Sequence, residues 1–178
     1  MTRAIFLDRD GVINEERGYV GLRKDFHFIS NIDKVLLESE RRGYLRIVVT
    51  NQSGIASKRF STRDFLTLTN WMSRELQLKG ASVTAVYWAP YANSEDAGEH
   101  PMRKPNPGMI LRAAKDFDIS LGESVMIGDQ LSDLLAARRA GVGRFILFGD
   151  SGIVAPGMDY MVATSHREVL SCLGWNTG

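Results

Sequence analysis

Two aspartates spaced two residues apart are the strongest chemical signal in the chain. Asp8 and Asp10 follow a short apolar run, residues 4–7, and precede Gly11, which allows a sharp backbone turn. Side chains at this spacing project to the same side of an extended segment, so Arg9 between them is expected to point away. Two neighbouring carboxylates repel each other unless a divalent cation neutralises them. Such oxygen ligands favour Mg²⁺, which binds a few carboxylates, water and a substrate phosphate.

A further carboxylate comes from a distant part of the chain. Asp129 ends another apolar run, residues 124–127 with Gly128, and Asp133 follows one helical turn later. We therefore predict a Mg²⁺ site formed by Asp8, Asp10 and Asp129. Asp133 is an additional or supporting partner, and the sequence leaves its role open.

Donors suited to a phosphate group follow two other segments. Four polar residues come directly after the apolar run 44–49: Thr50, Asn51, Gln52 and Ser53. Their hydroxyl, amide and backbone groups could cradle phosphate oxygens. Arg103 adds a bidentate cationic fork and Lys104 a compact positive charge. Each motif alone is more often a turn or a solvated loop, but their combination favours a phosphate site.

The elements that must position these residues alternate between two periodicities. Apolar runs without polar alternation predict strands buried on both faces, at residues 4–7, 44–49, 83–89, 124–127 and 144–148. Helical stripes lie between them: around residues 32–36, behind a capping signal at Ser61 and Asp64, from Pro107 with Asn106 as cap, and before Gly141. This order predicts an α/β fold with a doubly wound, mainly parallel sheet. Ligands bind at the carboxyl ends of strands in such sheets, where every polar cluster above is found.

Composition narrows the class of protein. The length of 178 residues and 44% hydrophobic content predict one domain spanning 1–178. A net charge of +1 gives no long-range field for nucleic acid or an anionic membrane. The one cysteine, Cys172, and the lack of a signal peptide or spanning segment lead us to expect a cytoplasmic protein. We also expect a monomer.

Together these motifs resemble those of the haloacid dehalogenase (HAD) superfamily of phosphohydrolases. Asp8-Arg-Asp-Gly is similar to its first motif, Thr50 to its second, Lys104 to its third, and Gly128-Asp129 with Asp133 to its fourth. The resemblance implies that Asp8 attacks phosphorus to form an aspartyl phosphate. It implies that Asp10 protonates the leaving alkoxide and then activates water, with Mg²⁺ as cofactor. Thr50 and Lys104 would offset the charge on the transferring phosphoryl group.

A closer resemblance is to the heptose 1,7-bisphosphate phosphatase family within this superfamily. It is carried by the segments 6–14, 17–20, 50–55 and 103–109. It implies hydrolysis of the 7-phosphate of a heptose bisphosphate, on the way to nucleotide-activated heptose for lipopolysaccharide or capsule. The implied substrate contacts are Arg17, Gly18, Tyr19, Asn51, Gln52, Ser53 and Arg103 with Lys104. The sequence does not decide the anomer, or whether an ADP- or GDP-linked heptose follows.

Other functions stay open beside this one. Histidinol-phosphate phosphatases are the next relatives, and a broader sugar phosphatase or a phosphosugar-binding module without catalysis would share the motifs. A nucleic-acid 3′-phosphatase is disfavoured because no basic stripe or stacking platform is apparent.

Three features of the sequence shape the expected site. The segments before the first helix and between Gly54 and Arg103 are too short for a large cap, so we expect an essentially capless, open site. Relatives usually carry a Cys/His zinc loop, but the matching positions here are Ala89, Tyr91, His100 and Met102. We therefore predict that structural Zn²⁺ is absent. Gln130 stands where relatives often have lysine, which removes a positive charge near the substrate.

Overall fold

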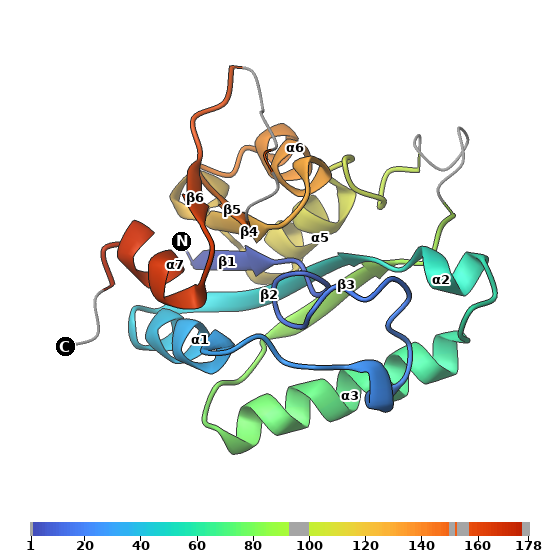
Figure 1. Ribbon diagram of the computed structural model, residues 1–178. Coiled ribbons are helices and arrows are strands. Elements are labelled where there is room, and N and C mark those ends of the chain that lie inside the picture. Colours follow the sequence, from blue (N-terminus) through green and yellow to red (C-terminus); the bar gives the residue numbers. More distant parts are fainter. Residues whose placement is uncertain (1, 93–99, 150–151, 153–156, 176–178) are drawn as a thin grey trace.

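A parallel sheet of six strands forms the centre of the molecule in the computed structural model (Figure 1), which describes residues 2–92, 100–149, 152 and 157–175. The strands are β1 (Arg3–Leu7), β2 (Tyr44–Asn51), β3 (Ala85–Ala89), β4 (Val125–Gly128), β5 (Arg144–Phe148) and β6 (Met161–Ala163). Their order across the sheet is β3-β2-β1-β4-β5-β6, and every pair is parallel. The predicted α/β fold with a doubly wound parallel sheet is confirmed.

Helices cover both faces of this sheet, as Figure 1 shows. One face carries α1 (Ile32–Arg41), α3 (Thr62–Leu78) and α7 (His166–Cys172), and the other carries α5 (Gly108–Phe117) and α6 (Leu131–Ala140). Two apolar clusters result, because alternate side chains of β1 enter opposite cores: Ile5 and Leu7 one, Ala4 and Phe6 the other. All four are fully buried, which explains the unbroken apolar run in the sequence.

The order of the strands brings distant polar residues to one edge. β1 pairs with β2 on one side, Leu7 opposite Val48, and with β4 on the other, Leu7 opposite Ile127. The chain thus winds outward from β1 in one direction and then returns to wind outward in the other. A crevice is expected at the carboxyl ends of strands where the direction reverses. Asp8, Asn51 and Asp129 therefore meet there.

Several local predictions can be checked against the helix and strand ends. The Ser61 cap of α3 is confirmed, since Ser61 Oγ accepts from Asp64 N (3.1 Å) and Asp64 Oδ2 accepts from Ser61 N (2.9 Å). The predicted start of α5 is wrong by one residue: Pro107 is the N-cap and the helix begins at Gly108. Asn106 therefore lies one position before the N-cap; its Nδ2 donates to the carbonyl of His100 at 3.0 Å, and its Oδ1 accepts from Arg139 Nη1 at 3.3 Å.

The remaining elements are short. They are α2 (Ser53–Ala56) and two 3-10 turns, η1 (Arg23–Asp25) and η2 (Leu121–Glu123). Between β1 and α1 the structure has only η1, which agrees with the expectation that no large cap is inserted there. No helix among the residues described is long and apolar enough to cross a membrane.

Candidate active site

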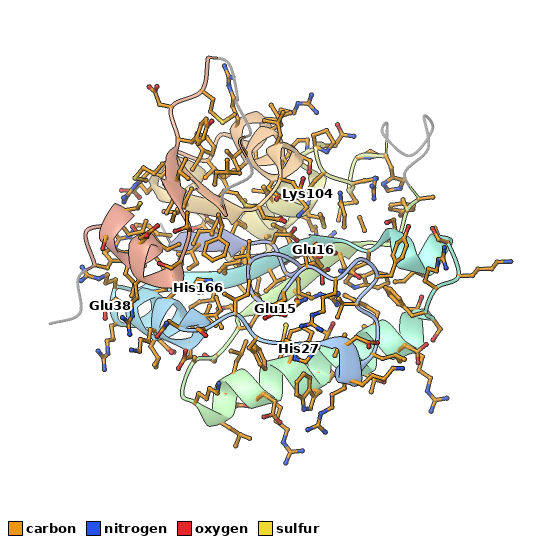
Figure 2. All side chains as sticks on the ribbon, viewed as in Figure 1. Glu15, Glu16, His27, Glu38, Lys104 and His166 are labelled. Atoms are coloured by element: carbon orange, nitrogen blue, oxygen red, sulfur yellow. The ribbon has the colours of Figure 1, made fainter. Side chains whose placement is uncertain are left out.

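A pocket of about 240 Å³ opens at the carboxyl ends of β1, β2 and β4. Figure 2 shows Lys104 and Glu16 at this edge, away from Glu38 on α1. The lining brings together most of the residues singled out in the sequence: Asp8, Asp10, Gly18, Tyr19, Asn51, Gln52, Ser53, Arg103, Lys104, Asp129, Gln130 and Asp133. Glu16, Val20, Gly54, Phe60 and Ser132 complete it.

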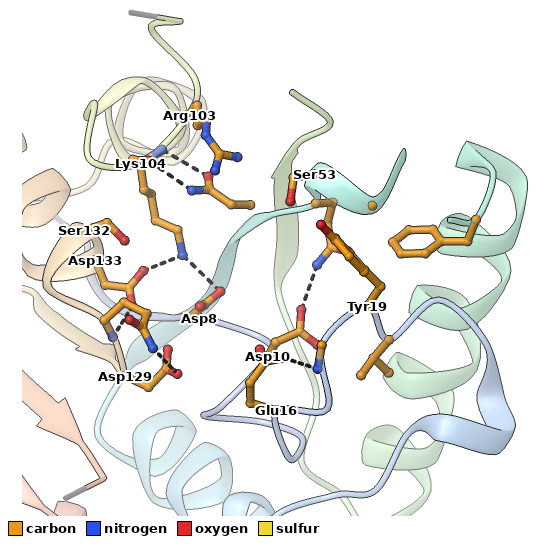
Figure 3. A pocket seen from close by; sticks show the side chains of 17 residues that line it. Asp8, Asp10, Glu16, Tyr19, Ser53, Arg103, Lys104, Asp129, Ser132 and Asp133 are labelled. Atoms are coloured by element: carbon orange, nitrogen blue, oxygen red, sulfur yellow. Dashed lines mark hydrogen bonds and ion pairs between the residues drawn. The ribbon is translucent and has the colours of Figure 1, made fainter. Parts of the chain in front are cut away.

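Lys104 lies at the centre of the polar network (Figure 3). Its Nζ contacts Asp133 Oδ1 at 2.6 Å and Asp8 Oδ1 at 3.0 Å, and it donates to the carbonyl of Val49 at 2.8 Å. Burial lowers the pKa of Lys104, but the Asp133 and Asp8 carboxylates outweigh it and hold that pKa above its ordinary value. Lys104 is therefore a fixed positive charge beside the first aspartate.

Asn51 holds this lysine from the neighbouring strand. Its Nδ2 donates to the Lys104 carbonyl, and its Oδ1 accepts from the Lys104 amide, both at 3.0 Å. The Asn51 side chain thus bonds to both backbone groups of Lys104 and fixes the segment that carries the lysine. Asn51 acts as a support for the cation, in addition to lining the pocket.

Three carboxylates converge behind Lys104. One oxygen from each of Asp8, Asp129 and Asp133 lies within 4.8 Å of the others. Burial raises the pKa of Asp8 to about 8; Lys104 opposes the rise, and Asp133, Asp129 and Asp10 add to it. Burial and Asp133 also raise the pKa of Asp129 to about 6. A cluster that resists ionisation in this way is suited to a divalent cation.

A buried carboxylate oxygen of Asp129 also indicates that the cluster can hold a cation. Asp129 Oδ1 is buried and has no hydrogen-bond partner among the residues described, while its Oδ2 accepts from Gln130 Nε2 at 3.1 Å. Gly11, with φ of +82°, allows Asp129 to approach, since a Cβ there would collide with the Asp129 carboxylate. The residues present therefore fit Mg²⁺, with oxygen donors only.

Asp133 has two structural tasks that the sequence left open. Its Oδ2 accepts from the amide of Gln130 at 3.0 Å, which caps the N-terminus of α6, and its Oδ1 holds Lys104. The residue is fully buried, and a Cβ at Gly128 would collide with it. Asp133 therefore fixes the lysine relative to β4 and α6.

The Asp10 carboxylate lies outside this cluster, which differs from the predicted set of Asp8, Asp10 and Asp129. Arg9 does not point away as expected: its Nη2 donates to Asp10 at 2.8 and 2.9 Å. Asn14 Nδ2 (3.0 Å) and Gln52 Nε2 (2.9 Å) donate to it as well. Arg9 is buried, and its Nη2 also donates to the Val20 carbonyl at 2.6 Å, so the guanidinium is fixed beside Asp10. As a metal ligand through its side chain, Asp10 would have to leave these donors.

Two other predicted residues do not line the pocket. Thr50 is buried at the end of β2, where its Oγ1 accepts from Gln52 Nε2 at 2.9 Å. Gln52, which lines the pocket together with Asn51 and Ser53, thus bridges Thr50 and Asp10. Arg17 lies outside, with half of its side chain exposed and its guanidinium paired with Glu15 at 2.7 Å.

Comparison with known proteins agrees with this geometry. Residues 101–150 match the HAD-hydrolase-like family model. The chain is 44% identical over 152 residues to the D-glycero-alpha-D-manno-heptose-1,7-bisphosphate 7-phosphatase of Burkholderia mallei, covering 83% of this chain and 80% of that protein. The chain belongs to the heptose bisphosphate phosphatase family. A relative from Vibrio cholerae, named for the beta anomer, is 43% identical over 148 residues and covers 81% of this chain and 80% of its own.

A solved member of the heptose bisphosphate phosphatase family also shares the fold. The crystal structure of D,D-heptose 1,7-bisphosphate phosphatase from B. bronchiseptica, complexed with magnesium and phosphate, superposes with a TM-score of 0.86. It is 27% identical and covers 97% of this chain and 98% of its own. This chain is therefore a phosphatase of the HAD fold.

Sequence reasoning missed two pocket residues outside the family motifs. Glu16 faces the pocket with its Oε1 on the Gly18 amide, and burial together with Asp10 raises its pKa. Phe60 packs beside Gly21 and Gly54, where a Cβ on either glycine would collide with its ring. Glu16 lies directly before the predicted contacts at 17–19, which is the one signal that could have found it. Nothing in the sequence points to Phe60.

The positions where relatives of this family usually hold zinc carry other groups. Tyr91 and His100 stack ring on ring, and the Met102 amide donates to His100 Nδ1 at 3.2 Å. Ala89 is the buried last residue of β3. Among the residues described, the one carboxylate, histidine or cysteine group with metal-ligand spacing is Asp8, Asp129 and Asp133. The predicted absence of Zn²⁺ stays a prediction, to be tested by metal analysis.

Proposed function

We propose that this chain is a Mg²⁺-dependent phosphomonoesterase that removes the 7-phosphate of D-glycero-D-manno-heptose 1,7-bisphosphate. One observation carries the proposal: Asp8 is held by Lys104 at the meeting point of β1 and β4, within reach of Asp129 and Asp133. Membership of the heptose bisphosphate phosphatase family supplies the substrate class.

Asp8 is the proposed nucleophile. Its Oδ1 accepts from the Arg9 amide at 2.7 Å and contacts Lys104, which orients the carboxylate and leaves Oδ2 to attack phosphorus. The new bond makes an aspartyl phosphate while the ester oxygen leaves. Lys104 stabilises negative charge on the phosphoryl oxygens as that charge develops.

Asp10 is the proposed acid and base. A sugar alkoxide is a poor leaving group, so a proton from Asp10 must reach the ester oxygen as its bond to phosphorus breaks. The same carboxylate then takes a proton from water, whose oxygen attacks the aspartyl phosphate and releases phosphate and free Asp8. Arg9, Asn14 and Gln52 hold the Asp10 side chain for both transfers.

Mg²⁺ would be held by Asp8 and Asp129, with Asp133 beside them, and when bound it supplies Lewis-acid neutralisation of phosphate charge. The pocket lining shows why a cation is needed, because its described residues include five carboxylates and only two basic side chains, Arg103 and Lys104. The lining carboxylates are Asp8, Asp10, Glu16, Asp129 and Asp133. Without a cation, a dianionic phosphate would meet a net negative site.

The substrate is a small phosphorylated sugar in this proposal. Arg103, Ser53, Asn51, Gln52, Gly18 and Tyr19 line the space available to it, and Arg17 would join only if its loop moved. Thr50 would act through Gln52. The product, a heptose 1-phosphate, would supply nucleotide-activated heptose for lipopolysaccharide or capsule. Cytoplasmic residence and a monomeric state stay predictions.

A substrate panel tests the proposal. Phosphate release should be measured with both anomers of the heptose bisphosphate and with histidinol phosphate, with and without Mg²⁺. We expect a heptose anomer to have the highest kcat/KM and to require Mg²⁺. A clear preference for histidinol phosphate would replace the substrate, and no Mg²⁺-stimulated release from any ester would favour a binding module without catalysis. Relatives named for alpha and for beta anomers are equally similar, so the panel also decides the anomer.

A further inference from the structure

Tyr91 and His100 form an aromatic pair that the phosphatase chemistry does not use. Their ring centroids are 3.4 Å apart and their planes are within 24° of parallel. Both residues are half-buried. They stand on either side of residues 93–99, which lie outside the described part of the chain. Stacking at this separation requires the two ends of the segment to be held face to face.

Both members of the pair also bond to the residues that follow. The Tyr91 carbonyl accepts from Arg103 Nη1 at 2.9 Å, and the His100 carbonyl accepts from the Arg103 amide at 3.0 Å. His100 Nδ1 accepts from the Met102 amide at 3.2 Å, so in the neutral ring the proton lies on Nε2. Side chain and backbone of Arg103 are therefore both anchored to the aromatic pair.

Arg103 is the residue that gains from this anchoring. It is buried, it lines the pocket, and it precedes Lys104, whose backbone Asn51 fixes from the other side. Burial lowers the pKa of the Arg103 guanidinium, which means that its position in the pocket is costly without fixed acceptors. The Tyr91 carbonyl is such an acceptor, and the ring of Tyr91 is fixed by His100.

We propose that the Tyr91–His100 pair is a positioning element for Arg103, held together by ring stacking. The stack fixes Tyr91 and His100 against each other, and their two backbone carbonyls hold the Arg103 side chain and amide. Tyr91 and His100 are positioning residues in this inference, since neither lines the pocket. The inference rests on the proposed function only for its activity measurements.

Steady-state kinetics test the positioning role. Tyr91→Leu and His100→Ala should each raise KM for a phosphomonoester such as p-nitrophenyl phosphate about two- to tenfold, the range expected for loss of one aromatic pair, with kcat within about twofold. Tyr91→Phe keeps the ring and the carbonyl and should restore the KM. His27→Ala, at an exposed histidine outside the pocket, is the matched control and should change nothing.

A double-mutant cycle identifies the residue through which the pair acts. In an Arg103→Ala background, Tyr91→Leu should have no further effect on KM. Full additivity of the two substitutions, or an unchanged KM in both single variants, would overturn the inference. Thermal unfolding of each variant separates a poorly folded protein from a misplaced arginine. If folding alone were at fault, Tyr91→Leu would be less stable and Tyr91→Phe would recover stability and KM together. If positioning is at fault, stability is unchanged in both variants and Tyr91→Phe recovers only KM.

Two measurements do not depend on catalysis. The ring protons of His100 should show an upfield ring-current shift by NMR that is lost in Tyr91→Leu and kept in Tyr91→Phe. Calorimetry with inorganic phosphate should show weaker binding for Tyr91→Leu by the same two- to tenfold. If the wild-type protein hydrolyses no ester, the proposed function fails while these two results still support or overturn the aromatic pair.

Discussion

The two walls of the pocket are built in opposite ways. The acidic wall, defined as Asp8, Lys104, Asp129 and Asp133, joins β1 and β4 through buried ion pairs, and the Lys104 and Asp133 side chains are 2% and 1% exposed. The loop wall, defined as Glu16, Gly18, Tyr19, Ser53 and Phe60, comes from connections outside the sheet, and Tyr19 is 51% exposed. The first wall has one arrangement fixed by packing, whereas the second can vary without disturbing the sheet. Chemistry should therefore depend on the first and substrate choice on the second.

The largest effect is expected at the acidic wall, from Asp8→Asn. Removal of the nucleophile should lower kcat by about 10⁴-fold or more while the fold is kept, because the amide still fits among the same neighbours. Phosphate release and circular dichroism measure the two effects. Asp116→Asn on the surface of α5 is the control and should retain activity. Wild-type turnover by Asp8→Asn would exclude the covalent mechanism.

Lys104→Met should damage stability as well as catalysis. It leaves the buried carboxylates of Asp8 and Asp133 without their cation, and breaking a buried pair costs about 3–5 kcal/mol of the free energy of unfolding. The loss of charge stabilisation should lower kcat by about 10²- to 10³-fold. Urea unfolding and initial rates provide the measurements. An unchanged unfolding midpoint would mean that the ion pairs of Lys104 do not fix the acidic wall in one arrangement.

Magnesium binding should depend on pH through the same carboxylates. Asp129, with its pKa raised to about 6, must lose a proton to bind the ion, so the affinity should fall about tenfold between pH 7 and pH 5 from this residue alone. Calorimetric titration with Mg²⁺ at both values tests this. Asp129→Asn should lower the affinity and remove the roughly tenfold part of the pH dependence that Asp129 contributes, while the part from Asp8 remains. A pH dependence in Asp129→Asn equal to that of the wild-type protein would show that Asp129 is not a ligand.

The stability of the metal-free protein should change in the opposite sense. The pKa values of Asp8 and Asp129 are raised in the folded state, so their contribution to stability is complete in acid, below the ordinary value of 3.8. It is lost as the pH rises through about 6 for Asp129 and about 8 for Asp8. Mg²⁺ should therefore raise the unfolding temperature more at pH 8 than at pH 5.5.

The smallest effects are expected at the loop wall and beside it. Tyr19→Ala should raise KM about two- to fivefold with kcat nearly unchanged, because it removes a pocket contact and leaves the acidic wall intact. Arg17→Ala should change KM by less than about twofold, since Arg17 forms an exposed pair with Glu15 outside the pocket. A larger effect from Arg17 than from Tyr19 would mean that this loop closes over the substrate.

The acidic wall was largely predictable from sequence, and the loop wall only in part, because Gly18, Tyr19 and Ser53 were among the expected contacts whereas Glu16 and Phe60 were missed. Asp8 and Asp129 each follow a strand end, and a parallel sheet brings such ends together whatever the side-chain details. Lys104 lies before α5 and reaches this edge through its backbone bonds to Asn51 at the end of β2.

Asp10 as a metal ligand stays a prediction. The direction of its carboxylate was not predictable, because β1 ends at Leu7 and the alternation of a strand does not extend to Asp10, which the buried Arg9 holds. Phe60 enters the pocket through tertiary packing against Gly21 and Gly54, for which the sequence has no local pattern.

The same contrast applies to the secondary structure. Long apolar runs such as 44–49 predicted their strands, although β2 continues through Asn51 into the polar motif that follows the run. β6 was missed because its three residues, Met161–Ala163, are too few to show a periodicity. Asn106 was taken as a helix cap from its residue type, but the carbonyl of His100 is its partner in the folded chain.

The double hydrogen bond between Asn51 and Lys104 determines how much of the chain must be synthesised before the site can form. It joins residues 53 positions apart, and the Asp8 amide bonds still farther along the chain, to the carbonyl of Ile127. A nascent chain of 100 residues already contains the proposed nucleophile, the proposed acid and the supporting Asn51 amide, but it lacks Lys104, Asp129 and Asp133. The site should therefore be completed only late in synthesis, and complementary fragments should be active only after they reassemble.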